Sequence, residues 1–221
     1  MSSCTWVLAS GNLGKAKEFE QALSGRGIEL VSQASLGVCA IDEPHGTFVE
    51  NALRKARHAA AQTARPSLAD DSGLVVPALG GAPGVHSARF FASDGVRNDA
   101  RAAAEALSGV PTDEANWRWL LHRMQGLEGV AREARFVCVL VAMRSADDPW
   151  PLVATGQWPG LILQSASGTQ GFGYDPIFYD PQLGRSAASL SLEEKVQVSH
   201  RGRALDQLIR MLDDATGPST A

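Results

Sequence analysis

The sequence predicts an α/β fold, in which strands and helices alternate around a sheet. Residues 6–9 indicate a strand that runs through a glycine-containing turn into a helix with apolar positions at helical spacing. Residues 67–76 form an apolar run around two acids, and residues 134–143 are apolar enough for a central strand. With 221 residues, of which 44% are hydrophobic, the chain can bury one substantial core, as one large domain or two small lobes.

Composition narrows the class of protein. The formal net charge of −4 argues against a nucleic-acid-binding surface, because no segment supplies the basic patch that neutralises phosphates. The three cysteines are widely spaced and form neither a disulfide framework nor a zinc pattern, which indicates reduced thiols in a cytoplasmic protein. We find no run of about 18 apolar residues and no charged-then-apolar leader, so we expect neither a membrane span nor a signal peptide.

The turn after the first strand is a candidate anion site. Residues 10–15, Ser-Gly-Asn-Leu-Gly-Lys, open the first helix, where free backbone amides point outward. Gly11 and Gly14 would let a phosphate approach the backbone, and Lys15 could add a positive charge. The segment is not a Walker loop, because its spacing is too short and no Gly-Lys-Ser/Thr follows. A plain strand-to-helix turn is the alternative interpretation.

A second strand is predicted at residues 28–33. A loop then leads into a long helix, which is predicted to open at Thr47 and to end near Ala64. Thr47 and Glu50 form a capping box, which satisfies orphan amides at a helix start. Lys55 lies on a polar face of this helix, so a rigid element aims it either at a phosphate or at solvent. The residues that share this face are Asn51, Lys55, His58 and Gln62.

Two adjacent carboxylates, Asp70 and Asp71, are the strongest catalytic candidates. Apolar residues on both sides indicate strand, so we expect the pair at a break in a sheet. Neighbouring strand side chains point to opposite faces, so one acid can face a cleft while a basic neighbour holds the other. An apolar setting requires a metal or a cation to compensate the two charges, so a divalent-metal or general-base site is one interpretation, and an ordinary Asp-Asp-Ser-Gly turn is the other. Another adjacent pair, Asp42 and Glu43, would by itself be a solvated surface loop.

The second half of the chain is predicted in less detail. A glycine-rich loop at residues 79–90 is placed to cover a site, and helices are predicted over residues 98–107 and 113–125. Residues 152–158 and 160–164 are predicted to pair as a hairpin around a Pro-Gly turn. We expect a single domain over residues 1–212, followed by a flexible tail at residues 213–221.

Two later segments are candidates for ligand contact. Residues 168–176 carry two aromatics and an acid on a glycine loop, which suits stacking on a flat base, or else fixes the loop to the core. Ser191 and Glu194 form a second capping box before the last helices. Gly202 interrupts the helical pattern, so residues 199–201 are expected at a helix junction where their side chains reach inward.

Taken together, these parts fit a metal-dependent nucleoside triphosphate site, with cations for phosphates, carboxylates for magnesium and water, and aromatics for a base. The chain resembles the inosine triphosphate pyrophosphatases, hydrolases of non-standard purine nucleotides. The resemblance covers residues 7–208 and rests on six motifs in the family's order. They are Ser-Gly-Asn-x-x-Lys at 10–15, Thr-Phe-Val-Glu-Asn-Ala at 47–52 with Lys55, Ala-Asp-Asp-Ser-Gly-Leu at 69–74, Gly-Gly-Ala-Pro-Gly at 80–84, Gly-Phe-Gly-Tyr-Asp-Pro at 171–176 and Ser-His-Arg-Gly at 199–202.

The resemblance implies hydrolysis of ITP, dITP and XTP to the monophosphate and pyrophosphate with Mg²⁺. It also implies a homodimer built on an elongated, mixed, twisted sheet flanked by helices, with two lobes and a central nucleotide cleft. Asp71 would be the metal-linked general base. The substrate-binding residues implied by the motifs are Ser10, Gly11, Asn12, Leu13, Gly14, Lys15, Lys55, Ser72, Phe172, Gly173, Tyr174, Asp175, Lys195, His200 and Arg201.

The acid loop departs from the family pattern. Where relatives often carry Glu-Glu-Thr-Gly, this chain has Asp-Glu-Pro-His at residues 42–45. Both Asp42 and Glu43 therefore remain candidate metal ligands beside Asp71.

Base choice has a physical basis in the residues that the resemblance implies. A 6-oxo group accepts hydrogen bonds from His200 or Arg201, whereas adenine presents an amino donor and leaves those donors unpaired. Three rival functions remain: a pyrophosphatase for modified pyrimidine nucleotides, a phosphatase with an aspartyl nucleophile, and a nucleotide sensor without catalysis. The first is disfavoured by the Ser-His-Arg and Phe-Gly-Tyr-Asp segments, and the second by the absence of Asp-x-Asp after the first strand.

Overall fold

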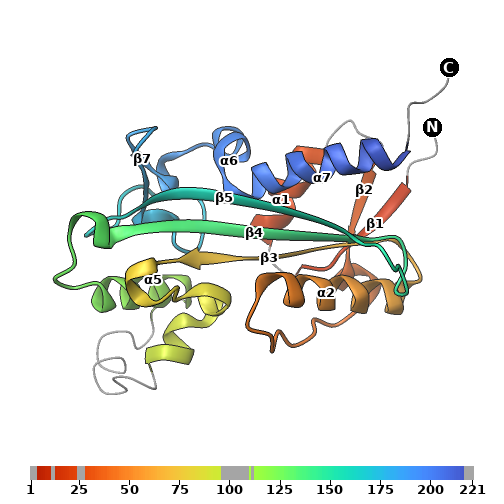
Figure 1. Cartoon of the computed structure of the whole chain (residues 1–221), viewed down its shortest axis with the longest axis horizontal. Coiled ribbons are helices and arrows are strands. Elements are labelled where there is room, and N and C mark those ends of the chain that lie inside the picture. Colours follow the sequence, from red (N-terminus) through yellow and green to blue (C-terminus); the bar gives the residue numbers. More distant parts are fainter. Residues whose placement is uncertain (1–3, 11–12, 24–27, 96–109, 111, 217–221) are drawn as a thin grey trace. The chain divides into compact units, whose positions relative to one another are not determined.

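A computed structural model describes residues 4–10, 13–23, 28–95, 110 and 112–216 of the chain. Seven strands of this described part form one sheet in the order β2-β1-β3-β4-β5-β6-β7 (Figure 1). The strands are β1 (Cys4–Leu8), β2 (Ile28–Ser32), β3 (Ser67–Val75), β4 (Glu133–Met143), β5 (Leu152–Ile162), β6 (Phe178–Asp180) and β7 (Arg185–Ser186). The helices are α1 (Leu13–Leu23), α2 (Phe48–Thr63), α5 (Thr112–Arg123), α6 (Leu192–Val198) and α7 (His200–Thr216).

Strand directions make the sheet mixed. β1 pairs in parallel with β2 and β3, whereas β6 pairs in antiparallel fashion with β5 and β7. The predicted α/β class, with a mixed sheet flanked by helices, is confirmed. Short 3-10 or π turns connect the elements at Gln33–Leu36, Pro77–Leu79, Gly84–Arg89, Phe91–Gly95, Gly129–Arg132, Asp175–Ile177 and Ala187–Ser189.

The chain divides into two compact units. The first unit comprises residues 1–72, 138–157 and 196–221, and the second comprises residues 73–137 and 158–195. The strands β3, β4 and β5 each pass from one unit into the other along the chain.

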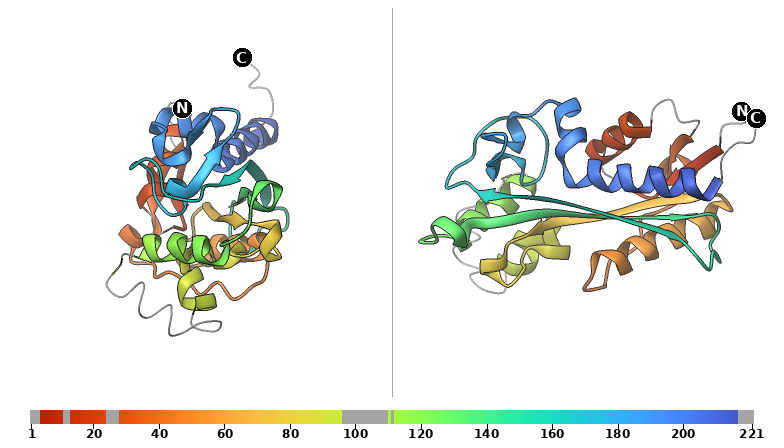
Figure 2. Two further views of the ribbon diagram at one scale, coloured as in Figure 1. Left: turned by 90° about the vertical axis from the view of Figure 1, so that its left-hand side faces the viewer. Right: turned by 45° about the horizontal axis from the view of Figure 1, so that its top comes forward.

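In the first unit the sheet is covered on both faces. One hydrophobic cluster joins strand residues to α1 and α7, and another joins them to α2 (Figure 1 and Figure 2). Within β4, Leu140 and Ala142 belong to the first cluster, and Val139 and Val141 belong to the second. Successive strand side chains point to opposite faces, so burial on both faces explains the continuous apolar run at residues 136–143.

The side-chain caps predicted at the starts of α2 and α6 are present. The Thr47 side chain accepts a hydrogen bond from the Glu50 backbone N–H, and α2 ends where Ala64 adopts a left-handed conformation with φ of 52°. At α6, the Ser191 N–H donates to the Glu194 carboxylate over 2.8 Å, and the Glu194 N–H donates to the Ser191 hydroxyl over 3.2 Å. These local contacts fix the starts of both helices.

The predicted Pro-Gly hairpin is wrong. β5 continues through Pro159 to Ile162, and the turn that precedes it lies at residues 144–151. Pro159 comes before Leu161 and Ile162, the residues of β5 that pair with β6, so its missing N–H removes no bond to that strand. At Gly160, a Cβ atom would come within 2.5 Å of a Phe178 ring carbon, so this position needs glycine for packing rather than for a turn.

The second unit is built around an aromatic cluster. The Phe178 ring centroid lies 4.5 Å from that of Phe136 and 5.0 Å from that of Trp158. The Trp158 indole N–H donates to Asp180 over 2.7 Å, which satisfies its polar atom in the core. Buried Arg132 donates to the backbone carbonyls of Met124, Leu127, Ile162 and Leu163.

The ends of two predicted segments differ from the structure or lie outside it. The predicted helix over residues 113–125 corresponds to α5, whereas the one over residues 98–107 lies outside the described residues. α7 extends to Thr216, past the start of the expected tail at Asp213, and residues 217–221 lie outside the described part. None of the helices in the described part is long and apolar enough to cross a membrane.

Candidate active site

The two adjacent acids of β3 point to opposite faces of the sheet. β3 runs without interruption from Ser67 to Val75, so the predicted break at the acid pair is wrong. The strand alternation is nevertheless the one expected. Leu68 packs into the cluster of α1 and α7, and Ala69 packs into the cluster of α2. Continuing this alternation, Asp70 meets residues of α1 and α7, and Asp71 meets residues of α2.

Asp70 lies in a buried network of two acids and two bases. Its side chain is 1% exposed and accepts a hydrogen bond from Lys15 Nζ over 2.9 Å. Arg201 Nη2 lies 3.5 Å from the other Asp70 oxygen and 3.1 Å from the Ser72 hydroxyl, and Arg201 Nη1 donates to Glu18. Burial alone would raise the pKa of Asp70, but the charges of Lys15 and Arg201, with a further contribution from Lys55, hold it well below its usual range. Asp70 is therefore an ionised acid that holds two cations.

Asp71 is held differently. Lys55 Nζ lies 3.1 Å from one Asp71 oxygen and 2.9 Å from Glu43, so one ammonium group joins two carboxylates. Burial raises the pKa of Asp71, and the negative charge of Glu43 adds to the rise, although the charge of Lys55 opposes it. The two neighbouring acids therefore have pKa values shifted in opposite directions, an arrangement typical of catalytic sites.

Lys55 keeps its charge in this setting. Burial alone would lower its pKa, but the charges of Asp70, Asp71 and Glu43 raise it above the usual value. The side chain comes from the middle of α2, a rigid element, as the sequence predicted. Lys55 is therefore a fixed positive charge beside the candidate base.

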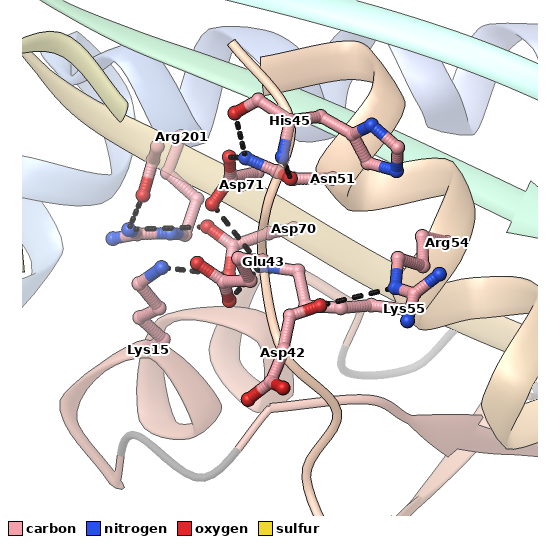
Figure 3. Close-up of polar contacts among 11 residues, drawn as sticks. Lys15, Asp42, Glu43, His45, Asn51, Arg54, Lys55, Asp70, Asp71 and Arg201 are labelled. Atoms are coloured by element: carbon pink, nitrogen blue, oxygen red, sulfur yellow. Dashed lines mark hydrogen bonds and ion pairs between the residues drawn. The ribbon is translucent and has the colours of Figure 1, made fainter. Parts of the chain in front are cut away.

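Asn51 connects the acid loop to Asp71 (Figure 3). Its side chain is fully buried, accepts a hydrogen bond from the His45 N–H over 3.0 Å and donates to the His45 carbonyl over 3.2 Å. The same amide nitrogen lies 3.3 Å from the second Asp71 oxygen. Asn51 thus fixes the position of the loop at residues 39–46, which includes Glu43, relative to Asp71.

The structure distinguishes the two acids of this loop. Glu43 directs its carboxylate to Lys55, whereas Asp42 receives a hydrogen bond from Arg54 Nε at its backbone carbonyl, over 3.1 Å. Figure 3 shows the Asp42 carboxylate pointing away from the Lys55–Asp71 pair. Glu43 is therefore the better placed of the two to act with Asp71.

The donor set suits a hard cation. Carboxylate oxygens are the ligands that Mg²⁺ prefers, and Mg²⁺ usually takes one or two of them together with phosphate and water oxygens. Within the part of the chain that the structure describes, no group of three or more histidine, cysteine or acidic side chains could hold a metal ion. The pair of Glu43 and Asp71 matches a site that draws its remaining ligands from substrate and water.

The predicted phosphate turn is described only in part. Ser10 lies just after β1, and α1 begins at Leu13 and includes Gly14 and Lys15. Gly11 and Asn12 lie outside the described residues. Lys15 reaches the acid pair, because its Nζ donates to Asp70 over 2.9 Å.

The second unit brings together the glycine-loop residues and Lys195. Lys195 Nζ lies 2.6 Å from Asp175 and 4.6 Å from the centroid of the Phe172 ring, and both Lys195 and Asp175 are buried. Asp175 also accepts the Phe172 N–H over 2.8 Å. Tyr174 is buried and donates its hydroxyl to the Ser87 carbonyl over 2.9 Å, so this aromatic fixes the loop to the core. Its neighbour Gly173 donates its N–H to Asp113 over 3.0 Å.

His200 and Arg201 lie at a helix junction, as predicted. α6 ends at Val198 and α7 begins at His200, and both side chains are buried. At Gly202, a Cβ atom would come within 1.7 Å of the Val196 carbonyl oxygen, so only glycine allows this close approach of the two helices. Contact of His200 and Arg201 with a base stays a prediction.

Sequence reasoning missed Glu18 and the role of Asn51. Asn51 lies one helical turn before Lys55, so its position on the Lys55 face was the available signal. Glu18 is a buried acid of α1 that pairs with Arg201, 183 residues away in the sequence. No local sequence pattern predicts this pairing.

Comparison with known proteins identifies the family. The Ham1 family model matches residues 6–211. The dITP/XTP pyrophosphatase of Escherichia coli is 48% identical over 206 residues, which cover 93% of this chain and 96% of that protein. The dITP/XTP pyrophosphatase of Yersinia pseudotuberculosis is 49% identical over 209 residues, which cover 95% and 98%.

Solved structures agree with this result. A HAM1 protein from Coxiella burnetii has a TM-score of 0.81 and 41% sequence identity, and the match covers 95% of this chain and 98% of that chain. A nucleoside-triphosphatase, or dITP/XTP pyrophosphatase, from Mycobacterium abscessus has a TM-score of 0.67 and 37% identity, over 93% and 98%. The resemblance carried by the six sequence motifs is confirmed, and this chain belongs to the Ham1 family.

Proposed function

We propose that this chain hydrolyses the non-standard purine nucleoside triphosphates ITP, dITP and XTP to the monophosphate and pyrophosphate, which removes them from the nucleotide pool. One observation carries the proposal, the arrangement of lysines around the acids of β3. Lys55 bridges Glu43 and Asp71, and the preceding acid, Asp70, pairs with Lys15. This group offers positive charge for a triphosphate and a carboxylate that can accept a proton from water. The dITP/XTP pyrophosphatase names of relatives at 48% and 49% identity support the same reaction.

In the proposed mechanism Asp71 is the general base. It accepts a proton from the water that attacks phosphorus, and its raised pKa makes it a stronger base than an exposed aspartate. Lys15 and Lys55 offset the negative charge that builds up on the leaving pyrophosphate. Asp70 stays ionised and positions Lys15, because its pKa is held below the usual range.

We propose Mg²⁺ as the cofactor, with Asp71 and Glu43 as its protein ligands. When bound, the ion would neutralise phosphate charge and lower the pKa of a coordinated water. We prefer Glu43 to Asp42, because the Asp42 carboxylate points away from Asp71 (Figure 3). Asn51 supports this assignment, since it ties the loop that carries Glu43 to Asp71.

Base selection in this proposal depends on hydrogen-bond donors. His200 and Arg201, both buried, would donate to the 6-oxo group of hypoxanthine or xanthine, whereas adenine presents an amino donor that cannot accept these bonds. In the second unit, Phe172 offers a flat ring, and the Lys195–Asp175 pair offers polar contacts for base and sugar. The homodimeric and cytoplasmic state implied by the family resemblance also belongs to the proposal, and a mass measurement in solution tests the dimer.

The reaction is tested by pyrophosphate release from ITP, XTP, ATP and GTP, measured side by side with magnesium and then with excess chelator. We expect fast, metal-dependent release from ITP and XTP and little release from ATP or GTP. Nucleotide binding without any release would favour a sensor instead. Release of orthophosphate would mean that a different bond is broken.

Replacement of Lys55 by alanine is expected to raise the KM for ITP about 10-fold or more, because the ammonium group that lies beside Asp71 would no longer be present to bind phosphate. Steady-state kinetics with ITP measures the effect. Lys17→Ala is the matched control, since Lys17 is an exposed lysine of α1, and its KM should stay at the wild-type value. An unchanged KM and kcat in Lys55→Ala would remove Lys55 from the site.

A further inference from the structure

A pocket of about 440 Å³ lies between α2 and the acid loop of the first unit. Its helix side includes Leu53, Arg54, Arg57 and His58, which recur at intervals of three and four residues along one face of α2. The site residues Asn51 and Lys55 line no part of the pocket and lie on the adjoining face of the same helix, where His58 borders both faces. The loop side is formed by Ile41 and His45. No catalytic role proposed above uses this pocket.

The pocket carries two guanidinium groups. Arg54 and Arg57 are one helical turn apart and exposed. Arg54 binds the Asp42 carbonyl through Nε, and Figure 3 shows its terminal nitrogens on the side away from Asp42. Glu50 is the one acid among the lining residues, and its carboxylate accepts a hydrogen bond from the Thr47 hydroxyl over 2.5 Å. Paired guanidinium groups are the preferred recognition elements for phosphate.

The rest of the lining is not that of a simple phosphate site. Ile41 and Leu53 provide apolar walls, and His45 and His58 provide flat rings. The volume falls within the range of about 300–1,000 Å³ that is typical of small-molecule pockets and exceeds what an orthophosphate needs. This combination suits a phosphate monoester that carries a flat ring system. The geometry points to a second nucleotide site, in which Arg54 and Arg57 bind the phosphate of a nucleoside monophosphate.

Hydrogen bonds made by the lining residues connect the pocket to the candidate active site. Arg54 holds the Asp42 carbonyl, and His58 Nε2 lies 3.1 Å from the Cys39 carbonyl. Both carbonyls belong to residues 39–46, the loop that carries Glu43. The backbone of His45 is bonded to Asn51, which in turn contacts Asp71. A phosphate that draws Arg54 away from Asp42 therefore loosens the loop that positions Glu43.

This inference rests on the proposed function, because a nucleoside monophosphate is a product of that reaction. Bound in the pocket, the product lowers kcat through the loop, in addition to any competition with the triphosphate. Inhibition of ITP hydrolysis by IMP is therefore expected to be mixed. In Arg57→Glu, which repels the phosphate, inhibition by IMP is expected to become purely competitive, with uninhibited turnover unchanged.

Binding is tested by equilibrium dialysis of the full chain with IMP, inosine and pyrophosphate as separate probes. We expect two IMP sites per chain in the wild type and one in Arg57→Glu, with an affinity loss of about 10-fold or more at the second site in Arg57→Ala. Arg65→Ala is the matched control, since Arg65 is an exposed arginine outside the pocket lining, and it should keep both sites. Inosine should occupy no Arg57-dependent site.

The possible outcomes separate this inference from the proposed function. One IMP site per chain in the wild type, unchanged by Arg57→Glu, would overturn the second site. An Arg57-dependent site that takes pyrophosphate but not IMP would overturn its assignment to a nucleotide. Arg57-dependent IMP binding in a protein that releases no pyrophosphate from ITP would support the second nucleotide site and contradict the proposed reaction.

Discussion

Replacement of Asp71 by asparagine is expected to lower the turnover of ITP at least about 100-fold, because the amide cannot accept a proton from the attacking water. Nucleotide binding should persist, since Lys15 and Lys55 keep their charges and asparagine has nearly the same shape as aspartate. The measurement is kcat for pyrophosphate release together with equilibrium binding of ITP. Turnover near the wild-type value would refute the assignment of Asp71 as general base.

The same variant is expected to be at least as stable as the wild type. Burial raises the pKa of Asp71, so the folded protein binds this proton more tightly than the unfolded chain does. Ionised Asp71 therefore lowers the free energy of unfolding at pH values above its folded-state pKa, and this effect vanishes below the unfolded-state pKa of about 3.9. Asparagine removes the buried charge. A melting temperature equal to or above that of the wild type near pH 7 would separate lost chemistry from lost folding.

Asp148→Asn provides the matched control for this variant. Asp148 is also a buried acid of the first unit, and it accepts hydrogen bonds from Arg144 and from the Trp150 N–H in the turn before β5. The Arg144 contacts lower the pKa of Asp148, so its ionised form stabilises the fold, in contrast to Asp71. We expect Asp148→Asn to melt at a lower temperature and to keep turnover within a few-fold of the wild type.

Features with a local cause could be predicted from the sequence. Thr47 and Glu50 fix the start of α2. They are three residues apart, so the sequence alone predicts this helix start. The opposite orientation of Asp70 and Asp71 follows from the period of a strand, and it persists although the expected break in the sheet is absent. The position of Lys55 on a polar face of α2 could also be predicted, and the structure places its ammonium group between Glu43 and Asp71.

Features that depend on distant contacts could not be predicted. Pro159 suggested a turn. A proline interrupts a strand only where its missing N–H is needed to pair with a neighbouring strand, and that pairing is set by the assembled sheet. Gly160 likewise suggested a turn, whereas its packing against Phe178 is the reason for a glycine. The choice between Asp42 and Glu43 depended on loop conformation, which Asn51 fixes through the backbone of His45.

Replacement of Arg201 by methionine is expected to lower the free energy of unfolding by about 3–5 kcal/mol. Arg201 and its partners Glu18 and Asp70 have side chains no more than 4% exposed. Methionine keeps much of the packing but removes the charge. Lys15 still pairs with Asp70, whereas Glu18 loses its buried contact with the Arg201 guanidinium. Urea unfolding measures the change, and a loss below about 1 kcal/mol would show that the network contributes little.

The double variant Arg201→Met, Glu18→Leu separates an uncompensated charge from lost packing. Replacing both members of a buried ion pair by apolar residues is often neutral, so the double variant should recover much of the stability lost in Arg201→Met. If the double variant is no more stable than the single one, packing rather than charge explains the loss.

The stability of the Arg201→Met variant, measured as a function of pH, tests whether Arg201 lowers the pKa of Asp70. Burial alone would raise the pKa of Asp70, but Lys15, Arg201 and Lys55 together hold it below its usual range. The folded protein then binds this proton less tightly than the unfolded chain, so Asp70 contributes stability above the unfolded-state pKa of about 3.9 and loses it as the pH falls through the folded-state pKa. The stability difference between the wild type and Arg201→Met should therefore shrink at pH values below about 4. A difference that stays constant over this range would mean that the pKa of Asp70 does not depend on the charge of Arg201.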